Sequence, residues 1–165
     1  MELKDLSCKN ENIDLDEYIF FREKIKKSMT HPEWLGDFSK EDLTYLLSNG
    51  SKIWIYYLDN LPVCSMFLIP SDEKTLKKFD VKLDYHKVVD YGPMMVDPKY
   101  LGNGLQLKML KELDKYSKEH NYIYAIATVH PENIYSLNNL VKDEFVLVNS
   151  KEFSRGLRNI YLKKL

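Results

Sequence analysis

The sequence predicts a single α/β domain spanning the whole chain of 165 residues, with a central mixed β-sheet flanked by helices. Apolar runs on both sides of Asp59-Asn60 predict an antiparallel hairpin, because both residues tolerate the positive φ of a tight turn. A strand at 88–96, a helix at 105–120 and an apolar run at 122–129 predict a parallel crossover. A sheet with both kinds of neighbouring strands is mixed.

The N-terminal part is predicted to supply one short strand and two helices. Residues 2–8 are assigned to the strand, and residues 15–29 carry apolar side chains at helical spacing. His31 and Pro32 end that helix, because the residue before a proline avoids the helical conformation. A second helix is expected at 39–47, with its first residue, a serine, as the N-cap.

The middle of the chain is predicted to carry most of the antiparallel pairing. Residues 52–58 and 61–69 are the two hairpin strands, and 71–85 form a polar connector with some apolar residues at helical spacing. A Gly-Pro pair interrupts the strand at 88–96. Proline donates no hydrogen bond to a sheet, so we expect a bulge or a separation of strands there.

The C-terminal part alternates between helices and strands. The helix at 105–120 has one continuous apolar stripe, and the uninterrupted apolar run at 122–129 is typical of a strand buried on both faces. Pro131 is expected in the first turn of a helix that runs to about Lys142. Residues 145–149 and 157–163 are predicted to be the closing strands.

Composition limits the classes of function. The net charge of −1 provides no overall field for attracting nucleic acid or an anionic membrane. Residues 1–16 lack the apolar segment of a signal peptide, and no run approaches the ~20 apolar residues of a membrane span. We therefore expect a cytoplasmic protein with reduced thiols at Cys8 and Cys64.

The segment Gly102-Asn103-Gly104 lies between a predicted strand and the longest predicted helix. Glycines allow a ligand to approach the backbone, and the first turn of a helix presents free N–H groups and partial positive charge, which favours a phosphate. A Walker loop would need Lys-Ser/Thr after Gly104, and a dinucleotide fingerprint would need a glycine at position 107. Both are absent. The glycines could instead merely shape a tight turn, and an unrelated phosphate-binding α/β protein remains an alternative.

The wider segment from Met94 to Gln106 resembles the acetyl-CoA-binding motif of the GNAT superfamily. A strand ending in Val is followed there by a Pro-containing turn and by Gln/Arg-x-x-Gly-x-Gly/Ala. Leu101 occupies the Gln/Arg position, Gly104 the central glycine and Gln106 the final position. The resemblance implies the GNAT fold and acetyl-CoA as cosubstrate. The residues it assigns to acetyl-CoA binding are Met95, Val96, Leu101, Gly102, Asn103, Gly104, Leu105, Gln106 and Asn133.

A second resemblance follows in the chain. GNAT domains carry an asparagine, a small residue three positions on, and a Gly-Phe pair eleven and twelve positions on. Asn133, Ser136, Glu144 and Phe145 stand at these positions, so Glu144 replaces the glycine. The tyrosine that often acts as general acid in the family would fall at Leu140. The resemblance covers roughly residues 50 to 163.

The resemblance implies direct transfer of the acetyl group to an amine, which must first lose a proton. Asp90 is the candidate general base, since many GNAT enzymes place a Glu six residues before the position of Val96; the alternative is a solvated carboxylate at a strand end. Tyr91 should point to the other face of the sheet. The acceptor is an amine-bearing small molecule or a peptide of unidentified kind.

Aromatic and histidine side chains complete the candidate site. The four histidines show no metal-ligand spacing, so no metal is expected. His130 falls near the expected pantetheine path, or is simply a turn residue. Trp34 and Phe38 either line an acceptor pocket or fasten helices to the core. The competing function is a GNAT-like acyl-CoA-binding module with weak or no catalysis. A homodimer is one of the assemblies left open.

Overall fold

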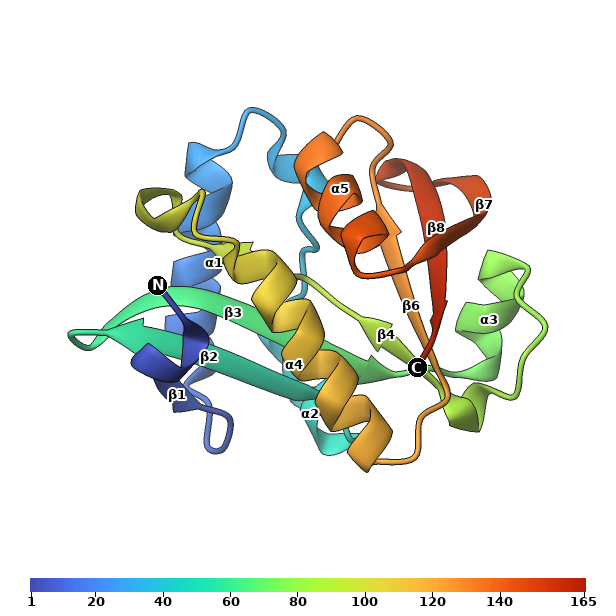
Figure 1. The fold of residues 1–165 in the computed structure, drawn as a ribbon, viewed down its shortest axis with the longest axis horizontal. Helices are drawn as coiled ribbons and strands as arrows, with labels where there is room; N and C mark the ends of the chain where they lie inside the picture. Colours follow the sequence, from blue (N-terminus) through green and yellow to red (C-terminus); the bar gives the residue numbers. More distant parts are fainter.

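Eight strands form one mixed sheet in the computed structural model, which describes residues 1–165 (Figure 1). The strand order is β1-β2-β3-β4-β6-β8-β7, and β5 pairs with β3. Only the pair β4–β6 is parallel, so the predicted mixed sheet and its crossover are confirmed. The strands are β1 (Ser7–Lys9), β2 (Lys52–Leu58), β3 (Leu61–Pro70), β4 (Val88–Tyr91), β5 (Met95–Val96), β6 (Tyr124–Val129), β7 (Val146–Phe153) and β8 (Gly156–Lys164).

Helices cover both faces of this sheet (Figure 1). In the view of Figure 1, α4 crosses in front of the sheet with α5 beside it, while α1 and α2 lie behind. None of the helices has the length and apolar composition that a membrane crossing requires. The helices are α1 (Leu15–Ser28), α2 (Lys40–Ser48), α3 (Glu73–Phe79), α4 (Leu105–Glu119) and α5 (Ile134–Lys142).

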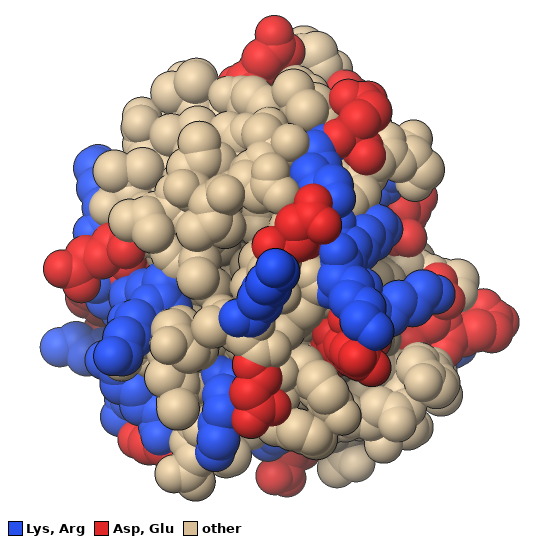
Figure 2. Space-filling model, turned by 90° about the vertical axis from the view of Figure 1, so that its right-hand side faces the viewer, with Lys and Arg blue, Asp and Glu red and all other residues tan.

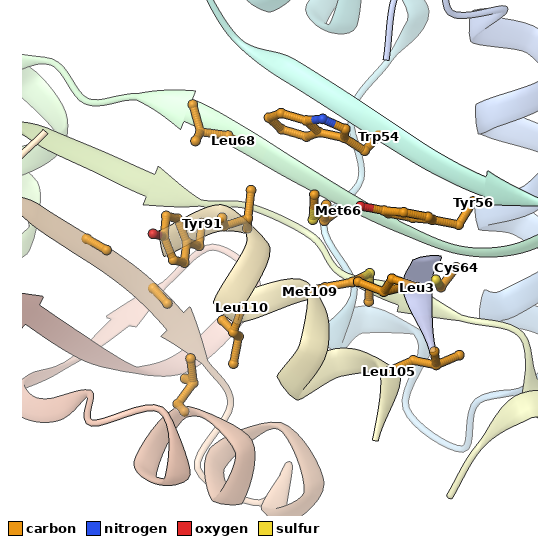
Figure 3. Close-up of a cluster of buried hydrophobic side chains, with 14 of the residues drawn as sticks. Leu3, Trp54, Tyr56, Cys64, Met66, Leu68, Tyr91, Leu105, Met109 and Leu110 are labelled. Atoms are coloured by element: carbon orange, nitrogen blue, oxygen red, sulfur yellow. The ribbon is translucent and has the colours of Figure 1, made fainter. Parts of the chain in front are cut away.

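Strand alternation divides the core between the two faces. On β2, Trp54 and Tyr56 pack with the apolar stripe of α4, including Met109 (Figure 3). Ile53 and Ile55 point the other way and pack against α1 and α2. Each helix therefore buries one apolar stripe against the sheet, and the sheet is apolar on both faces.

Local signals correctly predicted the first helices and the hairpin. The Ser39 hydroxyl accepts the Asp42 N–H at 3.0 Å, and the Asp42 carboxylate accepts the Ser39 N–H at 2.9 Å, which starts α2. Asp59 and Asn60 have φ of 49° and 62° and connect β2 to β3. These are the backbone angles that a two-residue hairpin turn requires.

Several predicted boundaries were wrong. Residues 3–5 form a 3-10 turn, so the first strand shrinks to 7–9. The connector at 71–85 contains α3, which the Asp72 carboxylate caps through the Thr75 N–H. The closing strands extend beyond their predicted ends to form the β7–β8 hairpin. Strand β6 begins at Tyr124, two residues after its predicted start, and α5 also begins later than predicted.

Helix α5 begins at Ile134, after the predicted start at Pro131. The Asn133 side chain accepts the Ser136 N–H at 3.3 Å and forms the N-cap. An asparagine cap satisfies one of the free N–H groups of the first turn, which a proline at the start cannot do. Pro131 therefore lies in the turn before the helix.

The Gly-Pro interruption creates the separation of strands that positions the site. Gly92 N–H still donates to the Phe67 carbonyl at 2.8 Å, and Met95 then pairs with Ser65. The β4–β5 chain uses one residue more than β3 to cover this stretch, which is a β-bulge at Pro93 and Met94. Beyond the bulge β5 pairs with β3 alone, so the parallel contact with β6 ends with β4.

Candidate functional site

A cleft of about 990 Å³ opens where β5 and β6 have separated. One side is formed by the β4–β5 chain and the loop that leads into α4. The other is formed by the end of β6, by α5 and by the β7–β8 turn. The chain between α1 and α2 lies over one end, contributing Trp34 and Phe38. Asp90 lines the cleft, and so does every residue predicted to bind the cosubstrate except Asn103.

The N-terminus of α4 faces this cleft with free backbone donors. The first main-chain hydrogen bond of the helix is that of Lys108 N–H to the Gly104 carbonyl, at 3.1 Å. The N–H groups of residues 102–107 have no acceptor within the chain, and no acidic residue lies in the first turn. These donors and the helix dipole make the spot attractive to an anion.

The two glycines at this turn are required by backbone conformation and leave room for a ligand. Gly102 and Gly104 have φ of 82° and 67°, in the left-handed region. A Cβ atom at either position would meet nothing within 4 Å. The space beside the free N–H groups is therefore open to the cleft.

Side chains behind the turn hold it in place. The buried Asp97 carboxylate accepts the Lys99 N–H at 3.0 Å and pairs with Lys24. Burial opposes the ionisation of Asp97, but the hydrogen bonds from Lys24 and Lys99 outweigh it and lower the pKa of the carboxyl. Asn103 donates to the Tyr100 carbonyl at 2.9 Å. Asn103 thus supports the turn from outside the cleft.

Gln106 links the two helices at the cleft. Its amide donates to the Ser136 hydroxyl at 3.0 Å, and its carbonyl oxygen accepts from Asn139 at 2.9 Å. The resemblance in sequence assigned Gln106 to the cosubstrate and gave no indication of this bridge. Gln106 on α4 and Ser136 on α5 are 30 residues apart, and their contact appears only when the two helices are packed together.

Asp90 occupies the face of the sheet opposite α4. It pairs with Ile69, which packs on the α1 side, whereas Tyr91 pairs with Leu68 on the α4 side. The Asp90 carboxylate lines the cleft without a hydrogen-bond partner from the chain, and desolvation raises its pKa to about 7. The Tyr91 hydroxyl donates to Asp114 at 2.9 Å, away from the cleft.

Leu140 stands where GNAT enzymes often carry a tyrosine, and it places an apolar side chain in the cleft. Leu140 lines the cleft and is 5% exposed. Tyr135 also lines the cleft from the first turn of α5, with 86% of its surface exposed. At the Gly position of the second motif, Glu144 has φ of 66°, so it adopts the backbone that favours glycine.

Three rings from two distant parts of the chain stack at one end of the cleft. Trp34 lies between His31 and His130, with ring centroids 4.3 Å and 5.0 Å away. Phe38 instead contacts Phe67 of the core edge-on. In the structure, no three or more His, Cys, Asp or Glu side chains converge as a metal site would need. The sequence analysis considered Trp34 and His130 separately, because no local pattern indicates that residues so far apart in the chain are in contact.

Comparison with known proteins places this fold. No family model matches the sequence, and no curated protein matches it. A GNAT-family acetyltransferase from Elizabethkingia anophelis with acetyl-CoA bound shares 14% identity, with a TM-score of 0.69 over 98% of this chain and 99% of its own. A GNAT-family acetyltransferase from Streptococcus agalactiae shares 15%, with a TM-score of 0.75 over 97% and 95%.

A third similar structure is the NatC complex bound to Gag peptide and CoA. It shares 17% identity, with a TM-score of 0.68 over 100% of this chain and 99% of the matched chain. At such low sequence identity, the structural similarity shows the fold alone. The chain has the fold of the GNAT acetyltransferases, a mixed sheet flanked by helices, as the sequence predicted.

Proposed function

We propose that this protein is an acyl-CoA-dependent N-acyltransferase that moves an acetyl group from acetyl-CoA to a primary amine. The observation that carries the proposal is the row of free N–H groups at 102–107 beside two open glycines. A diphosphate satisfies such donors and is favoured by the helix dipole. Similar folds hold acetyl-CoA or CoA in their solved structures, which supports the same cosubstrate here.

The separated strands supply the place for the thioester arm. Asp97 N–H donates to the Val63 carbonyl at 2.8 Å, and strand alternation then turns the Val96 N–H away from β3. That donor faces the gap left by β6. In the proposal it binds the cosubstrate, together with the main chain of Met95, and can stabilise negative charge that develops on a carbonyl oxygen.

Asp90 completes the proposed chemistry. With a pKa of about 7, it can accept a proton from the incoming ammonium at neutral pH. The free amine attacks the thioester carbon, a C–N bond forms and the C–S bond breaks. The nitrogen then gives up its second proton, which the departing thiolate takes up to leave as the CoA thiol. Thiolate is a good leaving group, so an acid at Leu140 is less essential than it would be for an alkoxide.

A catalytically weak acyl-CoA-binding module is the second candidate. Two observations favour it: the buried Leu140 replaces the family's tyrosine, and Gln106 is bonded to α5. Neither removes the N–H cradle, so cosubstrate binding is common to both candidates.

A thiol-release assay separates the two. Purified protein with acetyl-CoA and a panel of amino acids, polyamines, aminoglycosides and peptides should release CoA thiol faster than a blank without protein. We expect turnover with at least one amine. Saturable binding of acetyl-CoA with no release across the panel would leave the binding module as the function.

A further inference from the structure

Arg158, at the edge of the cleft, is a buried cation without an anionic partner. It is 3% exposed, and its guanidinium donates only to the main-chain carbonyls of Leu157, at 2.9 Å, and Glu33, at 3.0 Å. No carboxylate lies within salt-bridge distance of it. Burial, and then the charge of Arg155, lower the pKa of Arg158. An arginine seldom stays buried unless something pairs with it.

Two further cations line the same end of the cleft. Arg155 is exposed in the β7–β8 turn, and Lys78 on α3 lies 4.8 Å from the ring centroid of Phe153. A Cβ atom at Gly36 would lie 2.9 Å from Pro93 and 3.8 Å from Arg155 Nη1, which places the Arg155 guanidinium close to the bulge.

Two carboxylates act on Arg158 from beyond ion-pair distance, since the charges of Glu33 and Glu152 raise the pKa of its guanidinium. Glu33 pairs with His31 at 3.0 Å, and Asp37 pairs with Arg22 and Lys26 at 3.1 Å and 3.2 Å. On the face that bears β7 and α3, negative side chains border each group of positive ones (Figure 2).

The arginine and the candidate base face the same side of the sheet. Asp90 is paired with Ile126, and Ile160 packs in the same cluster as Ile126. Arg158 lies two residues from Ile160 on β8, so alternation directs it to that face. A molecule with its amine near Asp90 can extend along the sheet toward Arg158 and Arg155, past the stacked rings of Trp34 and His130.

We propose that Arg158 and Arg155 form an anion-binding subsite, and that the amine acceptor carries a carboxylate or a phosphate that binds there. The identification of the bound molecule as an acceptor rests on the proposed acyl transfer, whereas the anion subsite itself does not. Guanidinium groups recognise carboxylate and phosphate through paired, charge-assisted hydrogen bonds. Arg158 also holds the Glu33 carbonyl, so the anion would be bound next to the chain that carries Trp34.

Matched acceptors test the specificity. The pairs 4-aminobutyrate with butylamine and phosphoethanolamine with ethanolamine differ mainly in the anionic group, and they separate carboxylate from phosphate. We expect kcat/KM at least about tenfold higher for the anionic member of one pair. Arg155→Ala should raise KM for that acceptor about tenfold and leave the neutral amine unchanged, while Arg155→Lys retains part of the preference. Lys164→Ala, an exposed cation at the far end of β8, is the control and should change neither.

A binding measurement works even without turnover. The Nε–H signals of the three arginines are followed by NMR while glutarate or inorganic phosphate is added; Arg22, already paired with Asp37, is the internal reference. We expect saturable shifts of Arg155 and Arg158 at millimolar concentration and no shift of Arg22. Turnover without these shifts, or equal preference for neutral amines, overturns the anion subsite alone. Shifts without turnover of any amine overturn the acyl transfer alone.

Discussion

A single carboxyl group, Asp90, governs how the proposed chemistry responds to pH. Its environment offers neither a cation nor a hydrogen bond, so desolvation alone accounts for a pKa of about 7. The same desolvation that makes Asp90 a useful base makes its ionised form costly to the folded protein. Two measurements follow, one on rate and one on stability.

Asp90→Asn should lower kcat about 100-fold, the lower end of what general bases contribute, with acetyl-CoA affinity unchanged. In the parent, kcat/KM should rise as pH increases through about 7, because only the ionised carboxylate accepts a proton. This rise of kcat/KM with pH should be absent from the Asp90→Asn variant. Thiol release from pH 6 to 9 measures both, with Glu132→Gln, an exposed carboxylate near the cleft, as control. Equal rates for variant and parent across this range would remove Asp90 from the mechanism.

The same substitution should stabilise the folded protein at neutral and higher pH. The folded pKa of about 7 lies above the ordinary value of 3.8, so the carboxyl group costs nothing below pH ~4 and progressively more up to pH ~7. Water in the cleft reduces the penalty, and we expect Asp90→Asn to gain about 2 kcal/mol above pH 7. Urea unfolding at pH 5, 7 and 8.5 measures this. A gain that does not grow with pH would contradict the desolvation of the Asp90 carboxylate in the folded protein.

Glu144 carries avoidable backbone strain. Its φ of 66° costs an L-residue about 1–2 kcal/mol, whereas glycine adopts it freely but loses more chain entropy on folding. We expect Glu144→Gly to raise the free energy of unfolding by up to about 1 kcal/mol, and Glu144→Ala to leave it unchanged within about 0.5 kcal/mol. Urea unfolding of the three proteins is the measurement. A glycine variant less stable than the parent would show that the Glu144 side chain contributes something that offsets the strain.

Among the elements, the first turn of α4 holds the proposed cosubstrate. In this proposal the binding groups are main-chain donors, so Leu101 and Gln106 can depart from the GNAT pattern without removing them. The side chain of Gln106 joins α4 to α5, while its N–H remains one of the proposed donors. The bulge after β4 lies on the same wall of the cleft as this turn, and it opens the cleft because it turns β5 away from β6.

Gly104→Asp tests this turn, with Gly104→Asn as a matched control. Both side chains have the same size and tolerate positive φ, and they differ in charge. A carboxylate beside a diphosphate should weaken CoA binding at least about 100-fold, against less than about tenfold for the asparagine. Calorimetric titration with CoA gives both affinities. Equal losses in the two variants would mean that backbone strain, and not repulsion, is responsible.

At the scale of the whole molecule, the sequence predicted what neighbouring residues determine. The hairpin at Asp59-Asn60, the apolar stripe of α4 and the Gly-Pro interruption are local patterns, and the structure has each of them. The start of α5 was missed because two capping signals compete there, and Asn133 satisfies a free N–H that Pro131 cannot.

The parts of the site that escaped prediction depend on the tertiary fold. The stack of His31, Trp34 and His130 joins the chain after α1 to the end of β6. Strand β8 inserts between β6 and β7, which brings Arg158 to the cleft. No periodicity in the sequence indicates that such residues meet, since their spacing is set by strand order.

A crystal structure of the protein determined with acetyl-CoA would test most directly the claim that the turn before α4 binds the diphosphate. We predict that the diphosphate lies within hydrogen-bonding distance of the N–H groups of residues 102–107. The thioester should then lie at the bulge near Met95, with its carbonyl carbon on the Asp90 side of the sheet. Acetyl-CoA bound elsewhere, or failing to bind at millimolar concentration while the turn stays empty, would contradict the account.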